Sequence, residues 1–403
     1  MLLSSAAHSQ NQTPVTASEP QLSKLSFSGL KRTKESFLQQ EFSSYIGKPL
    51  TPKVLAKFES DLQALNIFSS IKFTKISESE ESAELLITVT EKVSFIPLPF
   101  AMYSSSTGFM MGGFIMDMNA GGQKDMFVTG LIWSPDKTMA MGTYAHPPKN
   151  GVPGFSVFGS VSKQESKIRN ADGENLLKYE NFTANASGNI LFKLNRYNNA
   201  SAGLGYSGFF PSDKDLHSEI YLRNRGLANA GWNISDKNWN GVFLSETSFG
   251  LKGQLSIDNK SHVVTELTAS AKMQQPVVQK LRVNIEAGGG IVIEPLITDG
   301  LGKGNARVAI LDDRFSTDRI AGLSSGFEYA FLQTKKIGTF SAYGDYQFVF
   351  ARDFDDSLVF CQGFNSGMKV YMKGLAFPAV SMGLAYNATK NKFYFSGSFG
   401  VSF

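Results

Sequence analysis

The last residues of the chain alternate between large apolar and small polar side chains. One face of this alternation carries Phe393, Phe395, Phe399, Val401 and Phe403, interrupted by Gly397. The other face carries Tyr394, Ser396, Ser398, Gly400 and Ser402. A period of two residues places the two sets on opposite sides of a β-strand. Because the second face is small and polar rather than charged, the pattern favours a strand that meets lipid over one in the core of a soluble sandwich.

Strand and turn patterns of this kind fill the chain from residue 95 onward. Counted backward from Phe403, they predict sixteen strands at about 391–403, 376–388, 358–371, 336–350, 321–333, 280–294, 261–275, 240–256, 224–236, 197–208, 177–193, 153–165, 137–146, 124–134, 108–118 and 96–105. The longest loop, about 295–320, separates the eleventh and twelfth strands. Open sheet edges in hydrocarbon would leave backbone groups unpaired, so we expect residues 95–403 to close into an antiparallel transmembrane β-barrel.

Residues 21–92 have a different pattern, which predicts one small α+β domain. A short strand ends near Gly29, and Thr33 is expected to cap a segment with helical spacing that stops at Gly47. Thr51 and Pro52 then begin a second helix. Two strands follow at 71–77 and 84–91, so the order is β-α-α-β-β. Residues 1–20 are polar and are expected to be a disordered N-terminal segment or the remnant of an export signal.

The composition argues against nucleic-acid binding, metal binding and catalysis. The chain has 33 Phe and 38 Gly, is 18% charged, and carries a net charge of +4, which is too small a surplus for a nucleic-acid footprint. One cysteine and four scattered histidines give no basis for a metal cluster or a Ser/His/Asp triad. We therefore expect no enzyme activity, no cofactor, no metal and no nucleic-acid partner.

The order of elements in the first domain resembles a POTRA domain. The resemblance lies in Gly29-Leu30-Lys31-Arg32-Thr33 after the first strand, Ile46-Gly47-Lys48-Pro49-Leu50 between the helices, Leu65-Asn66-Ile67-Phe68 before the second strand and Val89-Thr90-Glu91-Lys92 at the end. POTRA domains precede the barrel in the BamA/TamA family of outer-membrane assembly and translocation proteins. The resemblance implies a barrel in the bacterial outer membrane with its POTRA domain in the periplasm.

The resemblance also implies a lock inside the barrel. In the family, the loop between strands 11 and 12 enters the lumen, and an arginine of a Val-Arg-Gly-Phe-type tetrad meets acidic residues of strands 12 and 13. Alternation places Glu328 and Asp345 inward on those strands. The tetrad itself is absent, so Arg314 or Arg319 would replace its arginine; we favour Arg314 over Arg319 and Arg307. A solvated loop above two unrelated acids is the alternative.

A weak seam between the first and last strands is a second implication. The last strand carries Gly397 and Gly400, and the first carries Pro97 and Pro99, which cannot donate to a ladder. In the family, these two strands form a lateral gate. The alternative is that these residues are the ordinary glycines and prolines found at strand ends. Phe403, with Phe399 and Val401, resembles the C-terminal sorting signal of outer-membrane proteins.

These features predict a protein that assists insertion of outer-membrane proteins or translocation of a polypeptide. Its expected partners are outer-membrane lipids, extended client polypeptides that add to the POTRA strand edge, and accessory periplasmic proteins. The alternative is a passive porin-like channel whose N-terminal domain is a docking module or plug.

Overall fold

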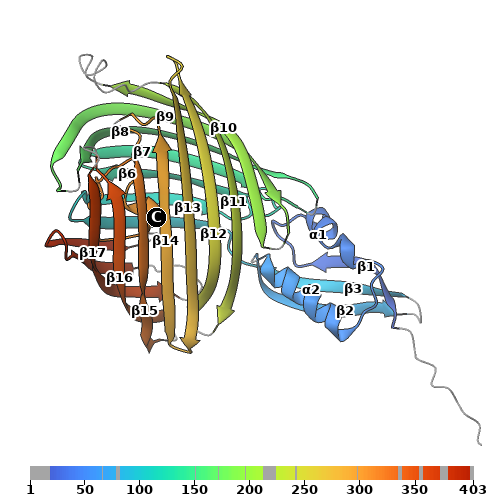
Figure 1. The fold of residues 1–403 in the computed structure, drawn as a ribbon. Coiled ribbons are helices and arrows are strands. Elements are labelled where there is room, and N and C mark those ends of the chain that lie inside the picture. The colour runs from blue at the N-terminus through green and yellow to red at the C-terminus, as the bar shows by residue number, and fades with distance from the viewer. Residues whose placement is uncertain are drawn as a thin grey trace, which may run out of the picture. The chain divides into compact units, whose positions relative to one another are not determined.

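The computed structural model describes residues 19–65, 67–78, 82–149, 151–170, 172–195, 197–211, 224–240, 243–296, 298–334, 338–353, 357–372 and 380–399. The chain divides into two compact units, residues 1–94 with 121–124, and residues 95–120 with 125–403. Figure 1 traces both units. No helix in the described ranges is long and apolar enough to span a membrane.

The first unit is a three-stranded sheet covered by two α-helices. Its elements are β1 (Gln21–Ser28), α1 (Glu35–Glu41), a 3₁₀ turn (Ser43–Tyr45), α2 (Pro52–Ala64), β2 (Phe68–Glu78) and β3 (Ser82–Glu91). The strand order is β1-β3-β2, in which β1 runs parallel to β3 and β2 antiparallel to it. The predicted β-α-α-β-β order is confirmed. Its core includes Leu38, Phe58, Leu62, Leu85 and Ile87, each at most 1% exposed.

The two helices begin differently. Thr51 caps α2 as predicted, because its Oγ1 accepts the Val54 N–H at 3.0 Å. The prediction that Thr33 caps α1 is wrong, since Lys34 is the residue before the helix and provides no side-chain cap. The Thr33 N–H instead donates to Glu91 Oε1 at 2.8 Å. Glu91 also accepts the backbone N–H groups of Lys31 and Arg32, so one carboxylate fixes the turn between β1 and α1.

The second unit is a closed antiparallel barrel of sixteen strands, β4 to β19. The strands are β4 (Phe95–Ser104), β5 (Gly108–Asp117), β6 (Met126–Ser134), β7 (Lys137–His146), β8 (Gly154–Arg169), β9 (Asn175–Lys193), β10 (Asn198–Pro211), β11 (Arg225–Asn240), β12 (Phe243–Asp258), β13 (Val263–Val278), β14 (Leu281–Ile293), β15 (Arg319–Gln333), β16 (Gly338–Arg352), β17 (Leu358–Met372), β18 (Val380–Asn387) and β19 (Lys392–Phe399). The predicted number of strands and the long loop between the eleventh and twelfth are confirmed. That loop contains a short helix, α3 (Lys303–Ala306).

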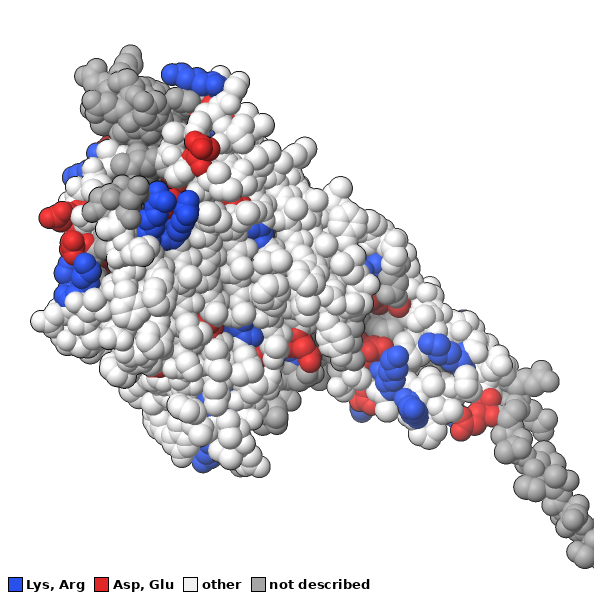
Figure 2. All heavy atoms as spheres, viewed as in Figure 1, with Lys and Arg blue, Asp and Glu red and all other residues white. Residues whose placement is uncertain are grey.

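The outer wall of the barrel is apolar. Large side chains such as Phe109, Leu131, Trp133, Leu204, Phe327, Phe350, Phe364 and Phe395 are 40% or more exposed. On β15, exposed Phe327 and Tyr329 flank Glu328, which is fully buried, so the expected alternation of apolar-out and polar-in holds there. Figure 2 shows a broad, largely uncharged surface over the barrel wall.

Candidate functional site: the lumen and the β4–β19 seam

The loop between β14 and β15, residues 294–318, folds inward and is here called the plug loop. Leu301, Ala306, Ile310 and Phe315 of the loop are each at most 3% exposed. They belong to one apolar cluster with inward-facing strand residues, which are Val264, Val292, Ile320, Val349, Ala351, Val359, Cys361 and Ala385. Burial of these side chains holds the loop inside the barrel independently of any ion pair.

Two glycines of the wall allow the loop to approach the strands closely. A Cβ on Gly288 of β14 would lie 2.2 Å from the Asn305 carbonyl oxygen, and one on Gly322 of β15 would lie 2.3 Å from that of Ala306. Any larger residue would force the backbone of the loop away from the wall.

Polar contacts tie the plug loop to the far strands. Gln347 Oε1 of β16 accepts the N–H groups of Ala309 at 2.7 Å and Ile310 at 3.2 Å. Asn387 Nδ2 of β18 donates to the Ile310 carbonyl at 2.9 Å. On the side of β8, the Arg169 N–H donates to the Arg314 carbonyl at 3.0 Å. The loop therefore bridges strands on different sides of the lumen.

Acidic residues of the loop add ion pairs at further points. Asp312 Oδ2 lies 2.9 Å from Arg169 Nη1 of β8. Asp313 pairs with Lys303 within the loop and also accepts a hydrogen bond from Ser104 of β4. Asp299 pairs with Arg225 of β11. These three acids connect the loop to strands that lie far apart in the ring.

The predicted role of the loop arginines is wrong. Arg314 Nη2 lies 2.7 Å from Asp136 Oδ2, in the turn between β6 and β7, and pairs with neither Glu328 nor Asp345. Arg319 lies beside Asp318 at 3.6 Å and is 55% exposed. Arg307 ends α3 with a left-handed backbone (φ 60°) and forms no ion pair with the described residues. The physical reason is the position of Arg314 in the plug loop. Its carbonyl accepts the N–H of Arg169 on β8, and its side chain reaches the turn between β6 and β7.

Glu328 is paired instead by Arg282 of β14. Arg282 Nη2 lies 2.7 Å from Glu328 Oε2, and the two residues are direct cross-strand partners. The Tyr371 hydroxyl donates to Glu328 Oε1 at 2.8 Å, the Ser341 hydroxyl donates to the same oxygen at 2.5 Å, and Lys369 Nζ lies at 3.6 Å from Oε2. We call these five residues the Glu328 cluster. The carboxylate is completely buried and nearly saturated with donors.

An aromatic ring completes the surroundings of Arg282. The guanidinium carbon lies 4.7 Å from the centre of the Phe243 ring and 5.8 Å from that of Tyr371. Arginine stacked on aromatic faces loses less free energy on leaving water than an isolated charge. Sequence reasoning missed Arg282 because its register with Glu328 depends on the two strands that the 25-residue loop separates.

Asp345 acts on the plug loop through Gln347. Its Oδ2 accepts hydrogen bonds from Gln347 Nε2 at 2.5 Å and from Ser324 Oγ at 2.9 Å, and its Oδ1 accepts one from Asn365 Nδ2 at 3.2 Å. A carboxylate that holds the amide nitrogen of Gln347 turns the amide oxygen toward the Ala309 and Ile310 N–H groups. Asp345 therefore points inward as predicted, but an amide rather than an arginine connects it to the loop.

Within the described residues, the ladder between β4 and β19 runs as far as Phe399, the last described residue of β19. Four residue pairs join the described parts of the two strands, from Ser104 with Ser396 to Ala101 with Phe399. Of the predicted seam and sorting-signal residues, Gly397 and Phe399 lie in this ladder, whereas Gly400, Val401 and Phe403 lie outside the described residues.

The edge of β4 that faces β19 lacks two of its donors. The Ser105 N–H donates to the Phe395 carbonyl at 2.9 Å, so odd-numbered residues of β4 direct their N–H groups toward β19. Pro97 and Pro99 are odd-numbered and have no N–H to offer. The prolines are therefore placed where they weaken the seam and spare the β4–β5 ladder.

Comparison with known proteins assigns the first unit. Residues 20–92 match the family model described as POTRA, surface antigen variable number repeat. Residues 20–92 are a POTRA domain. No curated protein matches the chain in sequence.

The chain resembles solved structures of BamA and CdiB in fold. BamA from Haemophilus ducreyi lacking POTRA domains 1–3 is 13% identical with a TM-score of 0.64, over 95% of this chain and 85% of that one. CdiB from Escherichia coli is 13% identical with a TM-score of 0.69, over 95% and 77%. CdiB from Acinetobacter baumannii is 14% identical with a TM-score of 0.65, over 96% and 74%. The POTRA domain thus precedes a barrel with the BamA and CdiB fold.

Proposed function

We propose that this protein lies in the bacterial outer membrane, with its POTRA domain in the periplasm, and assists the insertion or translocation of polypeptides. The observation that carries the proposal is the β4–β19 seam, where two prolines lie on the edge of β4 that faces β19. A strand that pairs weakly with its neighbour is the part of a closed barrel that exchanges partners at least cost. Likeness in fold to BamA and CdiB supports the same role. We expect no covalent catalysis.

The POTRA sheet supports a client-binding step. One edge strand, β1, is partly covered by residues 47–50, since the Leu22 N–H donates to the Lys48 carbonyl at 2.9 Å and the Leu50 N–H to that of Pro20 at 3.0 Å. The other edge strand, β2, pairs within the described residues with β3 alone. An extended client segment would therefore add to β2, as in β-augmentation. Accessory periplasmic proteins would compete for the same edge.

The plug loop disfavours the alternative of a passive channel. Its buried residues and its bonds to β8, β16 and β18 place packed protein across the lumen. A porin-like barrel of this size would keep an aqueous channel open. The lumen thus fits a barrel that is closed at rest and changes when a client arrives.

A disulfide across the seam tests the proposal. Met102 and Ser398 are cross-strand partners of the pair type whose Cα atoms lie closest together. Met102→Cys with Ser398→Cys, in a Cys361→Ala background, would lock β4 to β19. The matched control is Ser381→Cys with Ser398→Cys, which joins β18 to β19 at a site where the two serine hydroxyls lie 2.7 Å apart.

We expect the seam disulfide to block the surface appearance of newly made outer-membrane or exported proteins in cells depleted of the native chain. A reductant should restore it, and the β18–β19 disulfide should have no effect. Normal surface appearance with a fully oxidised seam would contradict the proposed function.

A further inference from the structure

The inner wall of the first barrel strands is apolar. Phe100 of β4, Phe114 of β5 and Val128 of β6 are at most 9% exposed and form a cluster. Partly buried side chains extend this cluster on β4 to β7, namely Leu98, Met102, Met110, Met116, Met126, Ile132 and Met141. We call this surface the methionine wall. It holds five of the chain's 13 methionines.

The side chains of the methionine wall face the lumen. Their neighbours in the sequence, such as Tyr103, Phe109 and Ile115, are 42–46% exposed on the outer face, so alternation sends the wall residues inward. No plug-loop residue belongs to their cluster. Barrel interiors are normally polar, and flexible, polarisable methionines suit a surface that accommodates varied apolar side chains.

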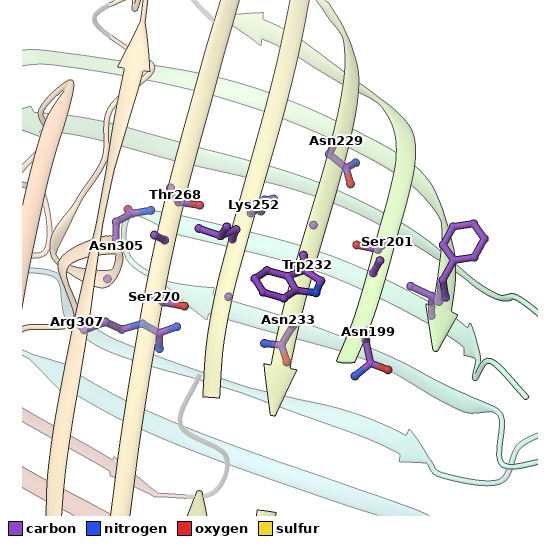
Figure 3. Close-up of a pocket in the computed structure, with 18 of the residues that line it drawn as sticks. Asn199, Ser201, Asn229, Trp232, Asn233, Lys252, Thr268, Ser270, Asn305 and Arg307 are labelled. Atoms are coloured by element: carbon purple, nitrogen blue, oxygen red, sulfur yellow. The ribbon is translucent and has the colours of Figure 1, made fainter. Parts of the chain in front are cut away.

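A cavity of about 560 Å³, whose lining includes Leu191, Trp232 and Leu251 as well as polar side chains, lies on another part of the lumen wall. Figure 3 shows it between β10, β11, β12, β13 and the plug loop. Amide and hydroxyl side chains line it, namely Asn199, Ser201, Asn229, Asn233, Thr268 and Ser270. Two cations border it, Lys252 from β12 and Arg307 from the plug loop.

These two cations lack partners in the part of the chain that the structure describes. Three other lumen cations are neutralised: Lys272 pairs with Glu246 at 2.9 Å, Arg225 with Asp299 and Arg282 with Glu328. Lys252 and Arg307 form no such pair and are exposed. Two unneutralised cations above a surface of amide and hydroxyl groups make a site that attracts carboxylates.

The ring places the two surfaces opposite each other. In the closed order of sixteen strands, β12 is the eighth strand from β4 in either direction. Lys252 on β12 therefore lies on the opposite side of the ring from Phe100 and Met102 on β4. β13, which carries Thr268 and Ser270, lies likewise across from β5 with Phe114. The lumen thus has one apolar side and one cationic side.

We propose that the lumen binds an extended polypeptide segment that is apolar on one face and acidic on the other. Its apolar side chains pack on the methionine wall, and its carboxylates meet Lys252 and Arg307. An extended chain with alternating residues presents two such faces at once. The inference rests on the proposed function, because it names the kind of client segment that the barrel takes, and it begins at β4, the strand that borders the seam.

Peptide binding to the purified full-length protein in detergent tests this inference. The probes are fluorescent nine-residue peptides of alternating Val and Glu, of alternating Val and Lys, and of the Val/Glu composition in two blocks. The variants are Lys252→Gln with Arg307→Gln for the cationic side, and Met116→Gln with Met126→Gln for the wall. Lys260→Gln, on the turn after β12, is the matched control. Heat-modified gel mobility verifies that each variant keeps a folded barrel.

We expect the native protein to prefer the alternating Val/Glu peptide over both other probes. Loss of both cations should lower the affinity for that peptide about tenfold, which corresponds to about 1.4 kcal/mol of binding free energy. The wall variant should lower the affinity for both alternating peptides. Lys260→Gln should change the affinity for neither. Equal binding of the Glu and Lys peptides, or unchanged binding after loss of both cations, would overturn the inference.

The seam disulfide separates this inference from the proposed function. The lock removes Met102 from the methionine wall but leaves Lys252 and Arg307 in place, so the locked protein should keep its preference for the Val/Glu peptide over the Val/Lys peptide. If the lock stops client passage but the peptides show no charge preference, only the lumen inference fails. If the peptide preference holds but the lock has no effect on clients, the proposed function fails.

Discussion

The Arg282–Glu328 pair is the most deeply buried ion pair in the described part of the barrel, at 5% and 0% side-chain exposure. Removal of one partner of such a pair leaves the other charge without compensation. We expect Arg282→Met to lower the free energy of unfolding by about 3–5 kcal/mol. Unfolding in guanidinium, followed by the fluorescence of Trp133 and the other tryptophans, measures this change in the free energy of unfolding.

The double variant Arg282→Met with Glu328→Gln should recover part of this loss, since it removes both charges. Arg319→Met is the matched control, because Arg319 is 55% exposed beside Asp318 and should change stability by at most about 1 kcal/mol. Equal effects of Arg282→Met and Arg319→Met would show that the Glu328 cluster contributes no more than a surface pair.

Residue patterns could predict which acids face inward but not what they meet. Alternation placed Glu328 and Asp345 inside because Phe327 and Tyr329 flank Glu328 on β15 and aromatic residues alternate outward after Asp345 on β16. Arg282 could not be paired with Glu328, since a 25-residue loop leaves the β14–β15 register undetermined by the sequence. Gln347 was missed because an inward glutamine is common in any barrel and carries no charge signal.

At the scale of elements, Gln347 and Asn387 hold the plug loop by its backbone. Gln347→Ala leaves the Ala309 and Ile310 N–H groups without an acceptor, at a cost of about 1–3 kcal/mol each. We therefore expect Gln347→Ala with Asn387→Ala to release the loop and raise single-channel conductance in planar bilayers. Gln333→Ala, at the exposed end of β15, should leave conductance as it is. Native conductance in the double variant would contradict a role for these bonds in closing the lumen.

The turn before α1 depends on an ionised Glu91. Burial raises the pKa of this carboxyl, but hydrogen bonds from Thr33, Lys31 and Arg32 outweigh it and hold the pKa below its usual value. Because the pKa of Glu91 is lower in the folded state, its ionisation stabilises the domain at pH values above the pKa of the unfolded chain, which is about 4.3. That stability is lost as pH falls through the lower folded value.

Hydrogen exchange of the Lys31–Thr33 amides in the full chain, corrected for intrinsic rates, checks this. Protection should be retained at neutral pH and fall in the acid range. Glu91→Gln should be less protected already at neutral pH and should lose the pH dependence. Glu84→Gln, also on β3 but half-exposed beside Lys24 at 3.9 Å, is the control. Identical pH profiles for native and Glu91→Gln chains would contradict the account.

Elements with strong local signals were predictable, and those set by tertiary contacts were not. The Thr51-Pro52 start of α2 was read correctly because capping is local. Thr33 was misread as a cap because its N–H bonds to Glu91, which lies 58 residues away. The inward fold of the plug loop has no periodic signature, and its contact with Gly288 and Gly322 appears only in three dimensions.

Over the whole molecule, the number of strands follows from the alternation of apolar and polar residues. The position of the weak β4–β19 seam follows from Pro97 and Pro99. Closure requires every strand to pair with two neighbours, and at the seam Pro97 and Pro99 of β4 have no N–H to offer to β19. The plug loop closes the lumen, and the methionine wall lies next to the seam on β4. A barrel built this way is stable around most of its ring and weak at one place.

Site-specific photo-crosslinking tests that central claim most directly. A photoreactive residue at Ala101 of the seam and another at Ala228 of β11, on the opposite side of the ring, would be compared in cells that produce an arrested outer-membrane client. The account predicts crosslinks to the client from Ala101 and none from Ala228. Equal crosslinking from both positions, or crosslinks from Ala228 alone, would contradict it.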